Sequence, residues 1–172
     1  MKRIAQAIAW AGVVMATSAL APAFAMDAGC KAYSAALHAL FYMPYHKHTT
    51  TPGRSGGAFT SDDIVVGGKQ YIYVPARGPI PAAKSVTPFD GPEAALVYDR
   101  DFGGLPLICK RVGRETVNGE AADIYVVSSD VTFATRLWIG QKSGRLLKDE
   151  SPSESGVPIR TVFTYDNIKA PW

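Results

Sequence analysis

The segment 107–147 constrains the fold most, because extended runs alternate in it with clear turn signals. Asn118-Gly119 is the dipeptide that favours a type I′ hairpin turn, and strand-like runs flank it on both sides. A second hairpin follows at once, turned by the polar residues 141–144. The segment therefore predicts an antiparallel meander with strands at Leu107–Val117, Ala121–Ser128, Val131–Gly140 and Arg145–Glu150.

The first 25 residues have the three parts of a secretory signal peptide. Lys2 and Arg3 form the charged start, an apolar run follows, and the Ala-Phe-Ala tripeptide at 23–25 supplies a small-x-small cleavage site. A retained membrane anchor is the alternative, but the run is interrupted by polar residues and is shorter than the roughly 20 apolar residues that a spanning helix needs. We therefore predict a cleaved signal peptide over 1–25, one domain over 26–172, and a periplasmic or secreted location.

The charge and size of the mature chain exclude some classes of function. Loss of Lys2 and Arg3 lowers the formal net charge from +3 to +1, so the mature chain has no basic surplus with which to bind nucleic acid. A chain of this length suits a single domain with its own hydrophobic core. We expect no nucleic-acid partner, no cofactor and no transmembrane segment after cleavage.

The chain contains two cysteines, Cys30 and Cys109. In an exported protein, the simplest interpretation is a disulfide that fixes the N-terminal segment to the central meander. Lipidation of Cys30 is the alternative, because Ala28-Gly29-Cys30 matches the end of a lipobox. Asp27 stands where that motif needs an aliphatic residue, which favours the disulfide.

Two helices are predicted. The first begins near Asp27 and ends before Pro44, and its apolar residues recur at helical spacing to form one stripe. The stripe is a core-facing side or a partner-binding face, and consists of Cys30, Tyr33, Leu37, Leu40 and Phe41. The second helix starts at a capping box formed by Asp90 and Glu93 and ends at Gly103-Gly104.

The remaining strands complete an α+β fold. Gly67-Gly68 joins strands at Asp62–Val66 and Lys69–Val74, and a last strand covers Pro158–Ile168. The proline-rich segment Pro75–Pro88 has little periodicity and is a candidate lid or a plain connection. We predict a strongly twisted antiparallel sheet, an incomplete β-barrel, that wraps the N-terminal helix and carries a second short helix.

Metal binding and catalysis have little support in the sequence. His46 and His48 point the same way in a strand, but no carboxylate lies within a few residues of them to orient a metal ligand, so we expect no metal site. A Ser-His-Asp set assembled from Ser34, His38 and Asp99 rests on composition alone. No hydrolase, zinc-protease or nucleotide-binding motif is present, and we therefore expect no catalytic residues and no enzyme activity.

The strand Leu137–Gly140, the turn Lys142–Gly144 and the strand Arg145–Leu147 follow one another directly. This strand-turn-strand pattern resembles that of the lipoprotein carrier superfamily (LolA/LolB-like), and the resemblance extends from about Phe41 onward. It implies an incomplete antiparallel barrel, closed by helices, that holds an acyl chain or another hydrophobic ligand.

Bulky side chains on both faces of the strand at 69–74 indicate that the sheet is covered on both sides or lines a cavity. We therefore predict a non-enzymatic periplasmic protein that binds or carries a lipid or acyl chain, with ligand contacts from Tyr71, Tyr73, Ile80 and Val86. The alternative is a structural or interaction module of the envelope, whose half-barrel is filled by its own side chains and whose partner is another envelope protein.

Overall fold

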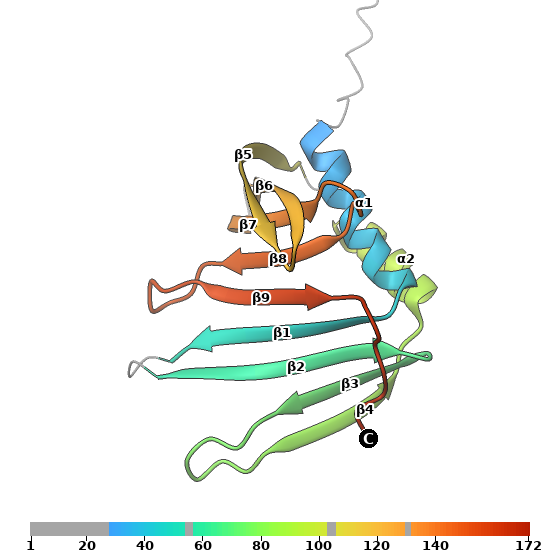
Figure 1. Cartoon of the computed structure of the whole chain (residues 1–172), viewed down its shortest axis with the longest axis vertical. Helices are drawn as coiled ribbons and strands as arrows, with labels where there is room; N and C mark the ends of the chain where they lie inside the picture. Colours follow the sequence, from blue (N-terminus) through green and yellow to red (C-terminus); the bar gives the residue numbers. More distant parts are fainter. Residues whose placement is uncertain (1–27, 54–56, 103–105, 130–131) are drawn as a thin grey trace, which may run out of the picture.

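The structure is a computed structural model that describes residues 28–53, 57–102, 106–129 and 132–172. The predicted signal peptide lies outside the described residues. Within them lie two helices and nine strands, and the strands form one sheet in the order β4-β3-β2-β1-β9-β8-β7-β6-β5 (Figure 1). The elements are α1 (Ala28–Tyr42), β1 (Tyr45–Pro52), β2 (Ala58–Val66), β3 (Lys69–Val74), β4 (Ala83–Pro88), α2 (Gly91–Phe102), β5 (Ile108–Val117), β6 (Glu120–Ser129), β7 (Thr132–Gly140), β8 (Leu146–Ser151) and β9 (Ile159–Thr164).

The sheet is antiparallel throughout and curls without closing, so that β4 and β5 remain as its two edges. Helix α1 contacts β5, β7 and β8, and α2 packs on α1 (Figure 1). This arrangement confirms the predicted α+β class, with an incomplete barrel around an N-terminal helix and a second short helix. Neither described helix has the length and apolar content that a membrane span requires.

Two hairpin turns follow directly from their dipeptides. Asn118 and Gly119 have φ values of 51° and 82°, and Gly67 and Gly68 have φ values of 59° and 70°. Positive φ at both central residues is the requirement of a type I′ turn, and Asn and Gly meet it at the lowest steric cost. The predicted hairpins are therefore confirmed.

Helix α1 packs its apolar side into the curl of the sheet. Cys30 is 1% exposed and Ala36 is equally buried, while Tyr33, Leu37 and Leu40 are partly buried against the same core. We call the face of the sheet that receives α1 the helix-facing face and the opposite one the outer face. The predicted stripe is therefore a core face, to which the structure adds Ala36.

Helix α2 begins as its capping sequence predicts. The Asp90 carboxylate accepts a hydrogen bond from the backbone N–H of Glu93 at 3.1 Å, which satisfies one of the free donors of the first turn. Gly91, the first helical residue, lies against the backbone carbonyl of Phe41 at the end of α1, and a Cβ atom at position 91 would collide with it. The glycine therefore sets how closely the two helices approach.

Trp138 anchors a second core on the outer face. Its ring is 2% exposed and packs with Val117, Ala122 and Leu147. The indole N–H donates a 2.6 Å hydrogen bond to the Glu115 carboxylate, so the buried polar atom is satisfied. Both faces of the sheet are thus apolar at this point.

Three segment boundaries differ from the sequence prediction. The segment at 83–88, predicted to be irregular, is the edge strand β4 and pairs with β3 along its whole length. Strand β2 starts at Ala58, before the predicted start at Asp62, and β9 is shorter than the predicted last strand. These runs are polar or proline-rich, and they are extended because a neighbouring strand supplies their hydrogen bonds, which no local pattern indicates.

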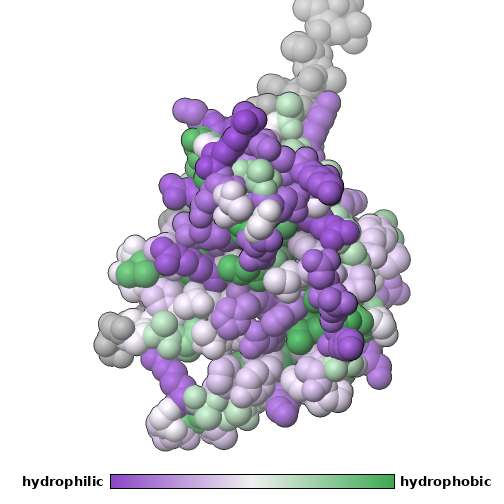
Figure 2. Space-filling model, viewed as in Figure 1, coloured by the Kyte–Doolittle hydropathy of each residue, from purple (hydrophilic) through white to green (hydrophobic). Residues whose placement is uncertain are grey.

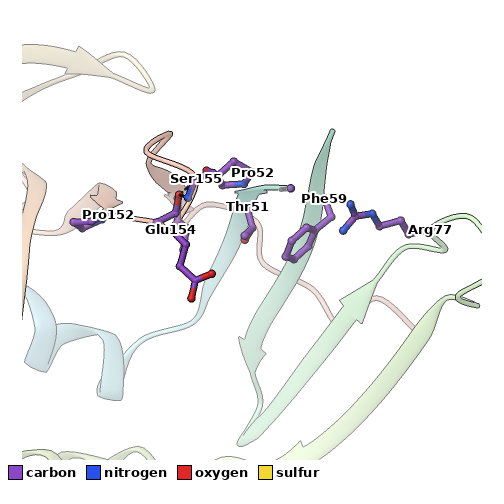
Figure 3. A pocket seen from close by; sticks show the side chains of 10 residues that line it. Thr51, Pro52, Phe59, Arg77, Pro152, Glu154 and Ser155 are labelled. Atoms are coloured by element: carbon purple, nitrogen blue, oxygen red, sulfur yellow. Dashed lines mark hydrogen bonds between the residues drawn. The ribbon is translucent and has the colours of Figure 1, made fainter. Parts of the chain in front are cut away.

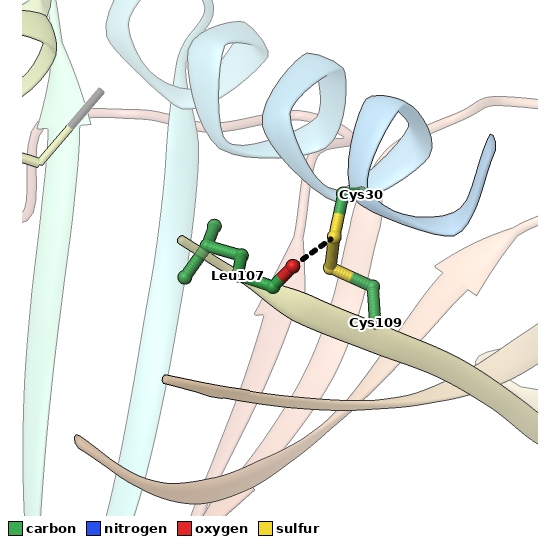
Figure 4. The surroundings of a disulfide bond; sticks show 3 residues. All are labelled: Cys30, Leu107 and Cys109. Carbon is green, nitrogen blue, oxygen red and sulfur yellow. Dashed lines mark hydrogen bonds between the residues drawn. A yellow bond between two sulfur atoms is a disulfide. The ribbon is translucent and has the colours of Figure 1, made fainter. Parts of the chain in front are cut away.

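The disulfide between Cys30 and Cys109 joins the first turn of α1 to the edge strand β5 (Figure 4). The two Cα atoms are 5.1 Å apart and the residues are separated by 79 positions. Cys30 Sγ also lies 3.5 Å from the carbonyl oxygen of Leu107, a contact rather than a hydrogen bond because a disulfide sulfur carries no proton. The predicted pairing is confirmed, and Cys30 has no free thiol to carry a lipid.

Loss of the disulfide should destabilise the fold without changing its strand order. The bridge closes a long loop, and the chain-entropy model gives a stabilisation of about 3 to 5 kcal/mol. We expect Cys109→Ala to lower the melting temperature and to leave the circular dichroism spectrum of the native state unchanged. Mass measurement of the exported wild-type protein after alkylation without reductant is the control, and two labelled thiols would contradict the pairing.

Trp138 should be a major contributor to stability. We expect Trp138→Ala to lower the free energy of unfolding by roughly 3 to 5 kcal/mol, because the change empties a packed site. The matched control is Trp172→Ala, since Trp172 is 48% exposed. Urea unfolding of the two variants should give a clearly larger loss for Trp138, and equal losses would refute this role.

Candidate functional site

A cavity of about 740 Å³ lies at the end of the sheet where the β1–β2 and β8–β9 connections meet (Figure 3). Thr51 and Phe59 are register partners on β1 and β2, and β9 contributes Ile159. Strand alternation puts these three side chains on the helix-facing face, beyond the part that α1 covers. The lining is Thr51, Pro52, Gly53, Phe59, Arg77, Pro152, Ser153, Glu154, Ser155 and Ile159.

The Arg77 side chain reaches the cavity from the β3–β4 connection. Its guanidinium carbon lies 5.3 Å from the centre of the Phe59 ring, within the range of a cation–π contact (Figure 3). A Cβ atom at position 53 would lie 2.9 Å from this guanidinium and 2.7 Å from the carbonyl oxygen of Gly57. Gly53 therefore makes room for the arginine at the cavity wall.

Serine side chains hold the β8–β9 connection on the other side of the cavity. The Ser153 hydroxyl donates to the carbonyl oxygen of Val157 at 2.5 Å and accepts a 3.2 Å hydrogen bond from the backbone N–H of Ser155. The two serine hydroxyl oxygens are 2.8 Å apart. This local network fixes the loop that carries Pro152 and Glu154 into the lining.

Under α1, the helix-facing face carries a charged cluster instead of a cavity. Lys47 Nζ lies 3.0 Å from the carboxylate of Asp63, which is 8% exposed and accepts two further hydrogen bonds from Gln70 at 3.0 and 3.1 Å. Burying these charges is tolerated because each has a partner. This part of the hollow is therefore occupied by the protein itself.

Asp149 lies on the same face, beside Thr161 of β9. Burial raises the pKa of Asp149 to about 6, and the repulsion of Glu150 adds to this, while the Thr161 hydroxyl and the Lys47 ammonium oppose it. Burial also raises the pKa of Tyr33 on α1, helped by Tyr98 and Asp149. The cluster therefore carries one carboxyl whose charge changes near neutral pH.

His46 and His48 meet a carboxylate that is remote in sequence. Nε2 of His46 and Nδ1 of His48 lie 2.7 and 2.8 Å from the same oxygen of Asp62 on β2. Partial burial acts to raise the pKa of Asp62, but the hydrogen bonds of His48 and His46 outweigh it, so the pKa lies below its ordinary value. Among the residues that the structure describes, no three His, Cys, Asp or Glu side chains are arranged to hold a metal ion.

His38 and Asp99, two members of the Ser-His-Asp set considered above, do meet. His38 Nε2 lies 2.8 Å from the Asp99 carboxylate, in an exposed pair that links α1 to α2. No hydrogen bond within the described part of the chain joins Ser34 to His38. The pair connects two helices on the surface and has no activated nucleophile.

The four predicted ligand contacts lie away from the cavity. Tyr71 and Tyr73 point to the outer face, where the ring of Trp172 lies 5.9 and 6.3 Å from theirs. Val86 is the register partner of Tyr71 on β4, and Ile80 lies in the β3–β4 connection, where it is 62% exposed. The structure thus brings Tyr71, Tyr73 and Val86 together under the C-terminal segment, and none of the four lines the cavity.

None of the cavity-lining residues was predicted from the sequence to contact a ligand. Phe59 precedes the predicted strand Asp62–Val66, and residues 152–155 have only a polar, turn-like composition. The cavity exists because β1 pairs with both β2 and β9. This pairing brings the ends of β1 and β2 beside the β8–β9 connection, which is far away in the sequence. The available signal was the bulky Phe59 beside Thr60, two residue types that favour a strand.

No protein-family model matches the sequence, and no curated protein matches it. The chain is similar in structure to MucB in complex with MucA(peri), with a TM-score of 0.56 and 14% identity over 83% of this chain and 57% of that chain. A MucA/MucB complex of Pseudomonas aeruginosa gives a TM-score of 0.57 and 13% identity over 83% and 59% of the two chains. At this identity the similarity shows the fold alone, and the chain spans less than two thirds of the MucB chains.

The matching structures also include the LolA superfamily protein NE2245 from Nitrosomonas europaea. The TM-score is 0.30 and the identity 9%, over 76% of this chain and 87% of that chain. LolA superfamily proteins are thus among the structures that the chain matches, as the strand-turn-strand motifs predicted. At this TM-score the match carries no argument about the site.

Asp149 should make stability depend on pH. The pKa of about 6 in the folded protein is above the ordinary 3.8, so the folded state binds a proton more tightly than the unfolded chain. Stability therefore falls as the pH rises from about 4 to about 6, and the loss is complete above that window. We expect Asp149→Asn to raise the free energy of unfolding at pH 8 by up to about 3 kcal/mol and to have little effect at pH 4.

The control for this prediction is Glu150→Gln on the same strand. Glu150 pairs with Lys148 at 3.2 Å and with Arg160 at 3.1 Å, so its neutralisation should lower stability instead of raising it. Urea unfolding of both variants at the two pH values is the measurement. A pH-independent effect of Asp149→Asn would show that burial does not govern this carboxyl.

Proposed function

We propose that the protein is a non-enzymatic, exported carrier that binds a hydrophobic small molecule, a lipid or acyl chain, in the cavity at the loop end of the sheet. The observation that carries the proposal is the mostly apolar lining, in which Phe59, Ile159 and the two prolines Pro52 and Pro152 surround about 740 Å³. This volume lies in the range of roughly 300 to 1,000 Å³ that is usual for small-molecule sites.

The physical driving force is the burial of apolar surface. Each methylene group that an acyl chain removes from water contributes about 0.8 kcal/mol, so a chain of moderate length is enough for measurable affinity. Most of the lining surface is apolar, so little polar surface loses its contact with water when a ligand binds. The β8–β9 loop is already fixed by the hydrogen bonds of Ser153 and Ser155. A site that is ordered before binding loses less entropy on binding.

The part of the hollow under α1 leaves no comparable space for a ligand. It is filled by Tyr33, Leu37 and Leu40 of the helix and by the Lys47–Asp63 cluster.

Export is part of the proposal: the leader at 1–25 has the composition of a signal peptide, and a disulfide persists in oxidising compartments. We therefore propose a periplasmic or secreted location.

An envelope interaction module is the second candidate. It is favoured by the self-filled hollow under α1 and by the MucB structure, which was solved with a protein partner, MucA(peri). In this alternative the cavity at the loop end takes no ligand, and a surface of the sheet binds a protein of the envelope. The two candidates differ in one measurable respect, the binding of an apolar probe by delipidated protein.

Titration with a solvatochromic fatty-acid probe tests the carrier proposal. We expect saturable binding by the delipidated wild type and a roughly tenfold or greater loss in the Phe59→Ala, Ile159→Ala double variant, because two apolar side chains of the lining are removed from the contact with the probe. The matched comparison is the Tyr71→Ala, Tyr73→Ala double variant, which alters the ligand set predicted from the sequence. Circular dichroism verifies that each variant is folded.

The variant that loses binding shows where the ligand lies. Loss of binding only in the Phe59, Ile159 variant supports the cavity, and loss only in the Tyr71, Tyr73 variant places the ligand on the outer face. Absence of saturable binding by folded wild-type protein would reject the carrier and leave the interaction module. Native mass spectrometry of the exported protein, searched for a co-purifying lipid, provides an independent check.

A further inference from the structure

The cavity wall carries an arginine, Arg77, for which the structure shows no acidic partner among the described residues. Its guanidinium lies over the Phe59 ring beside Gly53. Most other arginines of the sheet do have acidic partners: Arg111 and Arg114 share Asp123, and Arg160 pairs with Glu150. Arg77 therefore lies against the apolar Phe59 ring, and no described carboxylate balances its charge.

A guanidinium in this position is suited to an anionic head group. Its planar fork of N–H donors matches the two oxygens of a carboxylate or phosphate, and stacking on an aromatic ring restricts its orientation. Arg77 is exposed, so an anionic head group can reach its guanidinium from solvent while the chain enters the cavity. The Phe59 ring in turn offers the apolar surface that a hydrocarbon chain needs directly below the head.

Among the described lining residues, the other charged one, Glu154, lies on the opposite side. Glu154 is carried by the β8–β9 loop, whereas Arg77 comes from the β3–β4 connection, and Thr51 and Phe59 lie between them (Figure 3). Glu154 takes part in an interaction of its own. The cavity is thus electrostatically asymmetric, and an anion is favoured at the Arg77 end and disfavoured at the Glu154 end.

We propose that the ligand is a single-chain anionic amphiphile whose head pairs with Arg77 and whose chain lies along Phe59 and Ile159. The inference rests on the proposed carrier function and adds the chemical class of the ligand. A fatty-acid carboxylate and an alkyl phosphate share the required chemistry, an anion with at least two oxygens on one apolar chain. A cavity of about 740 Å³ matches one such chain with a compact head.

The experiment compares dansylamino-undecanoic acid with its methyl ester, which lacks the negative charge and adds one methyl group. For the wild type we expect the acid to bind about tenfold more tightly than the ester, the ratio that corresponds to about 1.4 kcal/mol. Arg77→Gln should remove this preference by lowering the affinity for the acid and not that for the ester. Arg77→Lys should retain part of the preference, because lysine keeps the positive charge but lacks the planar set of guanidinium donors. Glu154→Gln is the matched control, a charge removal in the same cavity that should leave the preference intact.

Competition identifies the head group. Laurate and dodecyl phosphate should displace the acid probe better than dodecanol does, and the ratio of the two anions separates fatty acids from alkyl phosphates. Equal affinity of the wild type for acid and ester, or an unchanged preference in Arg77→Gln, would overturn the assignment of an anionic ligand while leaving a carrier in place. Failure of both probes to bind would reject the carrier proposal and this inference with it.

Discussion

An antiparallel sheet that curls without closing must cover two faces and protect two edges, and the rest of this structure depends on how that is done. Helix α1 covers the helix-facing face and is fixed to the edge strand β5 by the Cys30–Cys109 disulfide. On the outer face, the segment after β9 crosses toward β4 and lays Trp172 over Tyr71 and Tyr73 (Figure 1). On the face shown in Figure 2, hydrophobic residues form separate small patches among hydrophilic ones. This distribution agrees with a sheet whose apolar side chains are mostly covered by other segments of the same chain.

The length of α1 divides the hollow into two chemically different parts. Under the helix, core side chains and the paired charges of Lys47 and Asp63 fill the space. Beyond the helix, the side chains of Phe59 and Ile159 have no helix above them, and an apolar cavity results. The cavity therefore exists because α1, a helix of fifteen residues, ends before it covers the whole helix-facing face of the sheet.

The similarity to MucB concerns this scaffold and not its site. A curled sheet with helices on one side is compatible with a bound molecule or with a bound protein, and function depends on the side chains that each chain places there. In this chain the cavity is lined by the ends of β1, β2 and β9 together with residues of the β3–β4 and β8–β9 connections. Connections positioned by a rigid sheet are common places for binding residues.

What the sequence determined by itself is local. The hairpins at Gly67-Gly68 and Asn118-Gly119, the cap at Asp90 and the apolar stripe of α1 each depend on residues a few positions apart. The pairing of Cys30 with Cys109 was determined because the chain has no other cysteine. Only the tertiary structure decided that β4 is a strand, that Asp62 joins His46 and His48, and that Phe59 and Arg77 share a cavity. The physical reason is that these contacts depend on the order of strands in the sheet, and that order is fixed by packing between segments far apart in the chain.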